Sequence, residues 1–506
     1  MNTGVRRLLG FCALFLLSVT ARHGDAADDF EAFKRQQMQG VQQIKQEFQE
    51  YKEKQDKEFA DFLKSQWSEF DTYRGKERIK EPKPKRVPVV VLPPPPVPKP
   101  APGSKPQPVP VTPPPVVYAP IVPAVLPPPP PQPKPIPLAG DMLEIEFFGN
   151  MVRFHFDQKW KDYRLSEGAK PEVMSAFWTM MSGTSYDVTV KEINDNSHTL
   201  KMDDWAGVTL WRSVVQALQP GRRSEQNLLL WYFLTKSGYD VRLGYAGSDV
   251  HLFVAMKQPV YSTKFTKVGN QVYYAVLAPD HGDSIRSFYT YDASYPEKLR
   301  AMDVQTAATG FTRTVSASRT LSFEYKGRQI KFTVPYDRRL VEYFDTFPQS
   351  DFDLYFDTDG SSLLKKSLFP DLQKYMTGMS PEEKVEFLLA FVQKAFAYKT
   401  DNDQFGRERY FFVEESMYFP YNDCEDRAIM FTWLVRELVG LKTVGLLYPG
   451  HMSAAVALPH TKPDYSTVGY KGVQYVIADP TYIGAPVGMP MPFYAKLKPS
   501  KVVEIR

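Results

Sequence analysis

Proline constrains this chain more than any other residue, because most of it is concentrated in one stretch. Of the 44 prolines, 26 lie between Pro82 and Pro137. Proline has no backbone N–H and a fixed φ, so this stretch can neither pair inside a sheet nor continue a helix. It favours an extended polyproline II conformation, at about 3.1 Å per residue. We therefore interpret residues 81–138 as a spacer between an N-terminal segment and a folded C-terminal part.

Residues 1–26 have the pattern of a secretory signal peptide. Arg6 and Arg7 precede the apolar run LLGFCALFLLSV, and small residues such as Ala21 and Ala27 follow it. A basic start, a short apolar run and a small-residue cleavage site are typical of an exported protein. The run is shorter than the roughly 20 apolar residues that span a membrane, which disfavours an uncleaved anchor. We expect a mature periplasmic or extracellular chain without a transmembrane span.

The segment before the spacer, residues 27–80, is predicted to be helical. Apolar residues recur at spacings of three and four in residues 41–51 and again in residues 59–70. On a helix this spacing gives one apolar stripe, with Lys, Glu and Gln on the other faces. Self-association of residues 28–74 as a short coiled coil is one expectation, and docking on a partner or a solvated helix are the alternatives.

Composition and charge exclude several classes of protein. Apolar residues make up 43% of the chain and charged residues 24%, so the chain is not disordered throughout. A net charge of +4 gives no electrostatic basis for nucleic-acid binding. The two cysteines, Cys12 and Cys424, are too few for a disulfide scaffold or a cysteine-rich zinc site. The histidines have no ligand-like spacing, so we expect no metal and no cofactor.

The chain after the spacer has the pattern of one unit used twice. The stretches LEIEFFGNMVRFHF (143–156) and LSFEYKGRQIKFTV (321–334) alternate apolar and polar residues around a glycine, which predicts two β-hairpins. A buried helix and two strands are predicted after each hairpin. We therefore predict an α+β fold with tandem modules at residues 139–317 and 318–506. Three pairs of positions correspond at offsets of 200 or 201 residues: Ser224 with Cys424, His251 with His451, and Ala278 with Asp479.

In the second copy, three of these residues suit nucleophilic catalysis. Cys424 begins a predicted helix, whose positive N-terminal end favours the thiolate. His451 begins a predicted strand and Asp479 ends another, so the two side chains lie together if the strands pair. A nucleophile, a base and an orienting carboxylate are the groups that acyl-transfer enzymes use. Glu425 and Asp426 are interpreted as residues that complement the helix dipole.

The same stretches resemble the bacterial transglutaminase-like superfamily. The sequences YNDCEDRAIMFTWLVREL, GHMSAAV and YVIADPTYIG match its three motifs in order, and the resemblance spans roughly residues 380–490. It implies a papain-like core with a catalytic triad of Cys424, His451 and Asp479. The superfamily contains transglutaminases, peptidases, amidases and catalytically dead members, so the resemblance does not identify the substrate.

One departure from the family pattern affects the oxyanion site. Transglutaminases use an upstream tryptophan near the oxyanion, and no clear counterpart lies between Tyr398 and Asp423. The backbone N–H of Cys424 is expected to be one oxyanion donor. Tyr418 and Gln404 are the candidates for the second donor.

The first copy lacks the orienting carboxylate. Its corresponding residues are Ser224, His251 and Ala278, and a serine is harder to activate than a thiol. We expect this module to be non-catalytic and to shape a substrate groove or bind a polymer. An active serine site is the alternative.

Three functions therefore stay open at the level of sequence. The first is an exported cysteine enzyme that hydrolyses amide bonds in a protein, a peptide or a cell-envelope polymer. The second is a transglutaminase that cross-links proteins. The third is a non-catalytic envelope scaffold or binding protein in which the three residues are a relic.

Overall fold

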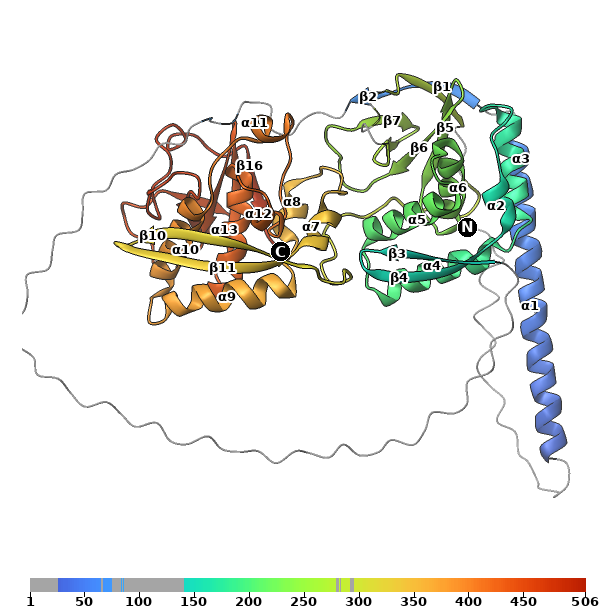
Figure 1. The fold of residues 1–506 in the computed structure, drawn as a ribbon, viewed down its shortest axis with the longest axis horizontal. Helices are drawn as coiled ribbons and strands as arrows, with labels where there is room; N and C mark the ends of the chain where they lie inside the picture. The colour runs from blue at the N-terminus through green and yellow to red at the C-terminus, as the bar shows by residue number, and fades with distance from the viewer. Residues whose placement is uncertain are drawn as a thin grey trace, which may run out of the picture. The chain divides into compact units, whose positions relative to one another are not determined.

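The computed structural model describes two compact units, which divide after Phe62 (Figure 1). Nearly all of the predicted signal segment and of the spacer lies outside the described residues, as do all side chains before Gln42. Among the residues that are described, no helix has the length and apolar character of a membrane span. The described residues are 26–64, 67–74, 83, 85, 141–278, 282, 284–291 and 295–506.

The predicted N-terminal helix is present but ends earlier than its apolar stripe. Helix α1 (Ala26–Leu63) is followed by strands β1 (Trp67–Asp71) and β2 (Tyr73–Arg74). The helical prediction is therefore wrong for Trp67 and Phe70. The ring of Trp67 packs 5.2 Å from that of Tyr245 in a distant strand, so tertiary pairing outweighs the local helical spacing.

The first module combines a hairpin, helices and a sheet. Its hairpin strands are β3 (Asp141–Phe147) and β4 (Asn150–Phe156). Its helices are α2 (Gln158–Asp162), α3 (Pro171–Ser182), α4 (Tyr186–Thr199), α5 (Asp204–Leu218) and α6 (Arg223–Lys236). Its sheet contains β5 (Val241–Ala246), β6 (Asp249–Ala255), β7 (Lys264–Val268), β8 (Gln271–Tyr274) and β9 (Ser287–Tyr291).

The segment from Trp67 to Arg74 joins the two edges of this first sheet. The strand order is β1-β9-β5-β6-β8-β7-β2, with β1 paired to β9 and β2 paired to β7. Thr72, between β1 and β2, donates its backbone N–H to the carbonyl of Arg286 at 3.0 Å. Strands β9 and β7 therefore both have backbone partners from one short segment. Without these partners their edges would be open to pairing with other chains.

The second module begins with the hairpin of β10 (Ser316–Tyr325) and β11 (Arg328–Asp337). The predicted boundary between residues 317 and 318 falls within the first residues of β10. Its helices are α7 (Arg338–Phe344), α8 (Phe352–Asp357), α9 (Ser362–Met376), α10 (Pro381–Ala395), α11 (Asp401–Phe405), α12 (Glu415–Tyr418) and α13 (Cys424–Val439). Its sheet contains β12 (Thr443–Tyr448), β13 (His451–Val456), β14 (Thr467–Tyr470), β15 (Val473–Ala478) and β16 (Lys501–Glu504).

The two sheets have the same strand order. The order β9-β5-β6-β8-β7 in the first sheet corresponds to β16-β12-β13-β15-β14 in the second, and all of these neighbours are antiparallel. In each module a buried helix, α6 or α13, directly precedes the first central strand. The protein therefore has a mixed α+β fold in which one order of elements occurs twice.

Both predicted hairpins are present, and their turns need glycine. In the first hairpin Phe147 pairs with Asn150, so the turn residues are Phe148 and Gly149. Phe148 and Gly149 both have positive φ, at 42° and 84°. This is the geometry of a type I′ turn, which matches the twist of the strands. A Cβ atom on Gly149 would also lie 2.0 Å from Nη1 of Arg339.

Helix α10 supports the second module, and removal of its N-cap should weaken the fold. Ser380 and Glu383 form a reciprocal capping box, in which Glu383 accepts from the Ser380 N–H at 2.8 Å. We expect Ser380→Ala to lower the free energy of unfolding by about 1 kcal/mol. Urea denaturation measures this change, with Ser322→Ala on the exposed face of β10 as the matched control. Equal losses in the two variants would contradict the assignment.

Candidate active site

Cys424 lies at the first position of the buried helix α13, which packs against β12 and β13. Its side chain is 0% exposed. The sulfur accepts a hydrogen bond from the backbone N–H of Met452, and the thiol donates to Oε2 of Glu425 at 3.2 Å. Met452 directly follows His451 on β13, so the structure places the sulfur against the strand that carries the predicted base.

His451 and Asp479 are brought together as the strand prediction requires. Strand β13 pairs with β15, and Ala478, the last residue of β15, is opposite Ala454. Nε2 of His451 lies 2.8 Å from Oδ2 of Asp479, and both side chains are buried. Oδ1 of Asp479 accepts the backbone N–H of Thr481 at 3.0 Å, which fixes the carboxylate. The imidazole is therefore held from one side by an oriented acceptor.

The second ring nitrogen of His451, Nδ1, is the one that could act as a base. Because Asp479 accepts from Nε2, the proton of a neutral ring is on Nε2 and Nδ1 carries the lone pair. Nδ1 is buried and has no hydrogen-bond partner in the part of the chain that the structure describes. The ring also stacks on Tyr494, with centroids 4.7 Å apart. A buried, oriented and unpaired basic nitrogen is what a general base requires.

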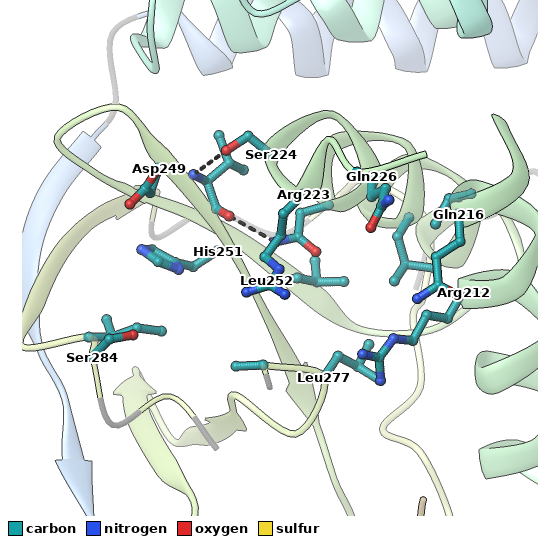
Figure 2. A pocket seen from close by; sticks show the side chains of 17 residues that line it. Arg212, Gln216, Arg223, Ser224, Gln226, Asp249, His251, Leu252, Leu277 and Ser284 are labelled. Atoms are coloured by element: carbon teal, nitrogen blue, oxygen red, sulfur yellow. Dashed lines mark hydrogen bonds between the residues drawn. The ribbon is translucent and has the colours of Figure 1, made fainter. Parts of the chain in front are cut away.

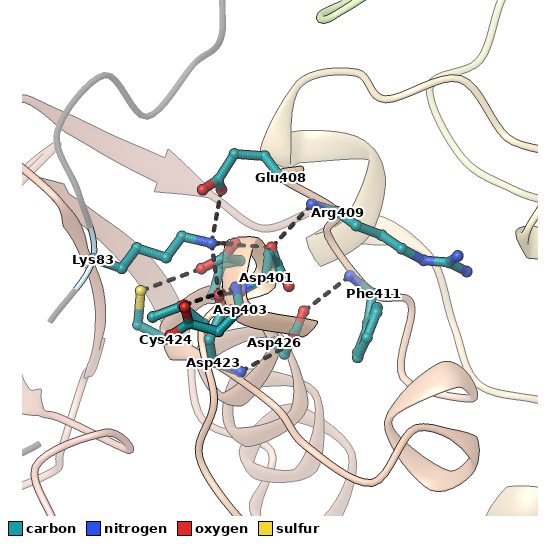
Figure 3. A network of polar contacts seen from close by, with 11 residues as sticks. Lys83, Asp401, Asp403, Glu408, Arg409, Phe411, Asp423, Cys424 and Asp426 are labelled. Carbon is teal, nitrogen blue, oxygen red and sulfur yellow. Dashed lines mark hydrogen bonds and ion pairs between the residues drawn. The ribbon is translucent and has the colours of Figure 1, made fainter. Parts of the chain in front are cut away.

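A cluster of buried carboxylates surrounds the N-terminal end of α13, and sequence reasoning missed it. Nζ of Lys83 lies 2.7 Å from Oδ2 of Asp423, 2.8 Å from Oε2 of Glu408 and 3.1 Å from Oδ2 of Asp401. It also contacts Oε1 of Glu425. Figure 3 shows this network beside the Cys424 sulfur. Lys83 belongs to the proline-rich stretch and is more than 300 residues away in sequence, so no local pattern indicated the contact.

The electrostatics at Cys424 differ from the sequence expectation. Burial raises the pKa of the Cys424 thiol, and the charges of Glu425 and Asp423 raise it further. The Lys83 charge and the Met452 N–H act in the opposite direction but do not outweigh them. The expected thiolate is therefore disfavoured in this conformation, because the carboxylates at the helix end outweigh the helix dipole.

The carboxylates themselves are strongly perturbed. Burial and the charge of Asp423 raise the pKa of Asp401, Glu425 and Asp426 above the ordinary range. Asp426 also completes the helix cap, since its carboxylate accepts the N–H of Asp423 at 3.2 Å and that of Phe411 at 2.9 Å. Asp426 thus has the predicted role at the helix end, whereas Glu425 contacts both the thiol and Lys83.

The cluster also has the geometry of a cation site. Oxygen atoms of Asp401, Glu408 and Glu425 lie within 4.8 Å of one another, as do those of Asp401, Asp423 and Asp426. The ammonium of Lys83 contacts four of these five carboxylates. The cation in this cluster is therefore the ammonium group of Lys83, and we assign it no metal ion.

The two proposed oxyanion side chains differ in their surroundings. Tyr418 ends α12 and is 47% exposed, with its ring against that of Phe419. Gln404 lies in α11, and its Nε2 is buried without a hydrogen-bond partner. Within the described part of the chain, neither side chain forms a hydrogen bond with Cys424.

The corresponding residues of the first module line an open cavity. Ser224, His251 and Ala278 contribute to a cavity of about 600 Å³, together with Arg212 and other residues (Figure 2). Oγ of Ser224 accepts the backbone N–H of Val250 at 3.2 Å. The fold thus brings the three predicted positions together, but Ala278 supplies no carboxylate to orient the imidazole.

Comparison with protein-family models, with curated proteins and with solved structures found no match to this chain.

Gln393 positions the loop that carries Asp479, which gives a test of the site's support. Its Nε2 donates to the carbonyls of Asp479 and Ala485, both at 3.0 Å, and its Oε1 accepts the N–H of Gly484 at 3.0 Å. Gln393→Leu should lower the free energy of unfolding by about 2 kcal/mol, because buried backbone groups lose their partners. The exposed Gln373→Leu is the control in the same urea titration, and a loss equal to that of the control would contradict this role.

The raised pKa of Cys424 predicts an unusual labelling profile. In a Cys12→Ser chain, the rate of iodoacetamide labelling should keep rising above pH 9 when folded, because the thiol retains its proton beyond its ordinary pKa of about 8.5. In urea, where the chain is unfolded, the labelling rate should level off above the ordinary thiol pKa of about 8.5. Glu425→Gln removes an adjacent negative charge and should move the folded midpoint to lower pH. A folded midpoint at or below that of the unfolded chain would be inconsistent with the structure.

Proposed function

We propose that this protein is an exported cysteine enzyme that acts on amide bonds through Cys424, His451 and Asp479. In this proposal the two modules are papain-like units of the transglutaminase-like type, and the second is catalytic. The main support is the 2.8 Å contact between His451 Nε2 and Asp479, together with the buried and unpaired Nδ1. The Met452 N–H that binds the Cys424 sulfur ties the nucleophile to the same strand.

These groups suit a two-step acyl transfer. Nδ1 of His451 takes the thiol proton of Cys424, and the sulfur attacks the carbonyl carbon of the amide. The backbone N–H of Cys424 donates to the oxyanion that forms, as helix N-terminal amides do. The C–N bond then breaks, the leaving amine takes the proton from His451, and a thioester remains. Asp479 holds the ring and stabilises its charged form.

The second step decides between hydrolysis and transfer. A water molecule gives a proton to His451, attacks the thioester carbonyl and releases the acid and the thiol of Cys424. Hydrolysis of a protein, a peptide or an envelope polymer is the favoured outcome, because water is the abundant acceptor outside the cytoplasm. Attack by a lysine amine would instead give a cross-link, and the same three side chains could serve either acceptor.

A non-catalytic binding protein is the second candidate, and one observation favours it. Cys424 is 0% exposed, and its thiol donates to Glu425 and not to His451. An enzyme with this arrangement has to open before substrate reaches the sulfur. A relic site would stay closed, so reactivity of Cys424 toward an amide substrate separates the two functions.

The test is peptide cleavage and amine incorporation by the full chain, with intact-mass detection of the thioester. Cys424→Ala should abolish both activities and the thioester. Asp479→Asn should lower kcat by about 10²–10⁴-fold, because the imidazole loses its orienting carboxylate.

Asp464→Asn, on an exposed loop, is the matched control and should leave the rates unchanged. Equal rates for the wild type and Cys424→Ala would exclude catalysis at this residue. Activity that is lost in Cys424→Ala but retained in Asp479→Asn would exclude the role given to Asp479.

A further inference from the structure

Lys83 is buried in a way that its sequence context does not explain. Its side chain is 1% exposed, whereas that of Lys85, two residues on, is 80% exposed. Lysine is strongly hydrated and is almost never fully buried unless it is paired. The cause of its burial must therefore lie in the site that receives it.

The receiving site is built from separate parts of the second module. Asp401 begins α11, Glu408 follows that helix, and Asp423 and Glu425 flank Cys424 at the start of α13. Three of the four oxygens lie 2.7–3.1 Å from Nζ of Lys83. An ammonium group has three N–H donors and no acceptor, so it suits a site of converging acceptor oxygens.

A second observation indicates unused binding capacity. The ring of Tyr410 lies 5.9 Å from Nζ of Lys83, a cation–π distance. Its hydroxyl is buried and has no hydrogen-bond partner among the described residues, and neither has Oδ1 of Asp423. The site therefore offers an aromatic face, a spare hydroxyl and a spare carboxylate oxygen beyond what Lys83 uses.

We propose that Asp401, Glu408, Asp423 and Glu425 form a subsite for a primary ammonium group of the substrate, and that Lys83 fills it from within the chain. The substrate class is a peptide with a lysine-like side chain beside the amide that is attacked. This assignment of substrate rests on the proposed function. The ammonium subsite itself depends only on the carboxylates and Lys83.

Lys83 acts as an occupant and not as an acyl acceptor. Burial disfavours its charge, but the carboxylates of Asp423, Glu425 and Asp401 outweigh burial and raise the pKa of Lys83 well above the ordinary range. A protonated amine has no lone pair with which to attack a thioester. The contact is therefore recognition of a cation, which a substrate ammonium can replace.

The occupant is also coupled to the nucleophile. Oε1 of Glu425 contacts Lys83, and Oε2 of the same carboxylate accepts the thiol proton of Cys424. Displacement of Lys83 by an incoming ammonium requires the site to open. The ammonium then contacts the same carboxylate, Glu425, beside the sulfur.

The test is calorimetric binding of Nα-acetyl-lysine methylamide to the full chain. Lys83→Met should bind it at least tenfold more tightly than the wild type, because an internal competitor at millimolar effective concentration is removed. Lys85→Met is the matched control and should bind as the wild type does. The norleucine analogue, which lacks the ammonium, should not bind to any of these chains.

Three outcomes would overturn the proposal. They are no binding of the lysine amide by folded Lys83→Met, equal binding of the norleucine analogue, and binding of Ca²⁺ in place of the amine. If Lys83→Met does not fold, the wild type still gives a test. Millimolar lysine amide should speed iodoacetamide labelling of its Cys424 at least twofold, and an unchanged rate would reject the subsite.

This experiment is independent of catalysis. The double variant Cys424→Ala, Lys83→Met has no nucleophile and should bind the lysine amide as Lys83→Met does. Binding without turnover in the wild type would reject the enzyme and keep the subsite. Turnover without amine binding would reject the subsite alone.

Discussion

The burial of helix α13 is the constraint from which the rest of the site follows. Every residue from Cys424 to Val435 is buried, so the free N–H groups at the start of the helix cannot be satisfied by water. At this end Asp426 accepts the N–H of Asp423, and Oδ2 of Asp423 accepts the N–H of Asp401. Carboxylates are thereby drawn into the interior, and an interior with several carboxylates requires a cation. Lys83 supplies that cation.

The same carboxylates set a conflict between stability and reactivity at Cys424. They stabilise the helix end, but they raise the pKa of the thiol that the proposed catalysis needs as a thiolate. Lys83 moderates this effect because its charge lowers the thiol pKa, yet it also fills the space beside the sulfur. A replaceable ammonium resolves the conflict, since the substrate then brings the compensating charge.

The parts of the fold with local patterns were predictable from sequence, and those that depend on distant pairing were not. Alternation around Gly149 and Gly327 indicated both hairpins, and the order of Cys424, His451 and Asp479 anticipated that helix and strands would meet. The end of α1 was missed because Trp67 and Phe70 continue a helical spacing, while their partners in β9 lie more than 200 residues away.

The candidate site was likewise predictable where local patterns define it and not where distant residues meet. The pairing of His451 with Asp479 follows from neighbouring antiparallel strands, and the sequence carries that signal. The role of Glu425 was hidden, because an acidic residue in the first turn of a helix is ordinarily a response to the helix dipole. Asp401, Glu408 and Lys83 carry no motif, and only the folded chain brings them to one point.

The two modules show what a shared order of elements does and does not determine. In the first, Ser224 and His251 line a cavity of about 600 Å³, and in the second the corresponding Cys424 is 0% exposed. The strand order is the same in both sheets, so topology alone does not close the second site. One difference is the set of carboxylates around α13 and the lysine they bind. In the proposed subsite, the residue that occupies these carboxylates controls access to Cys424.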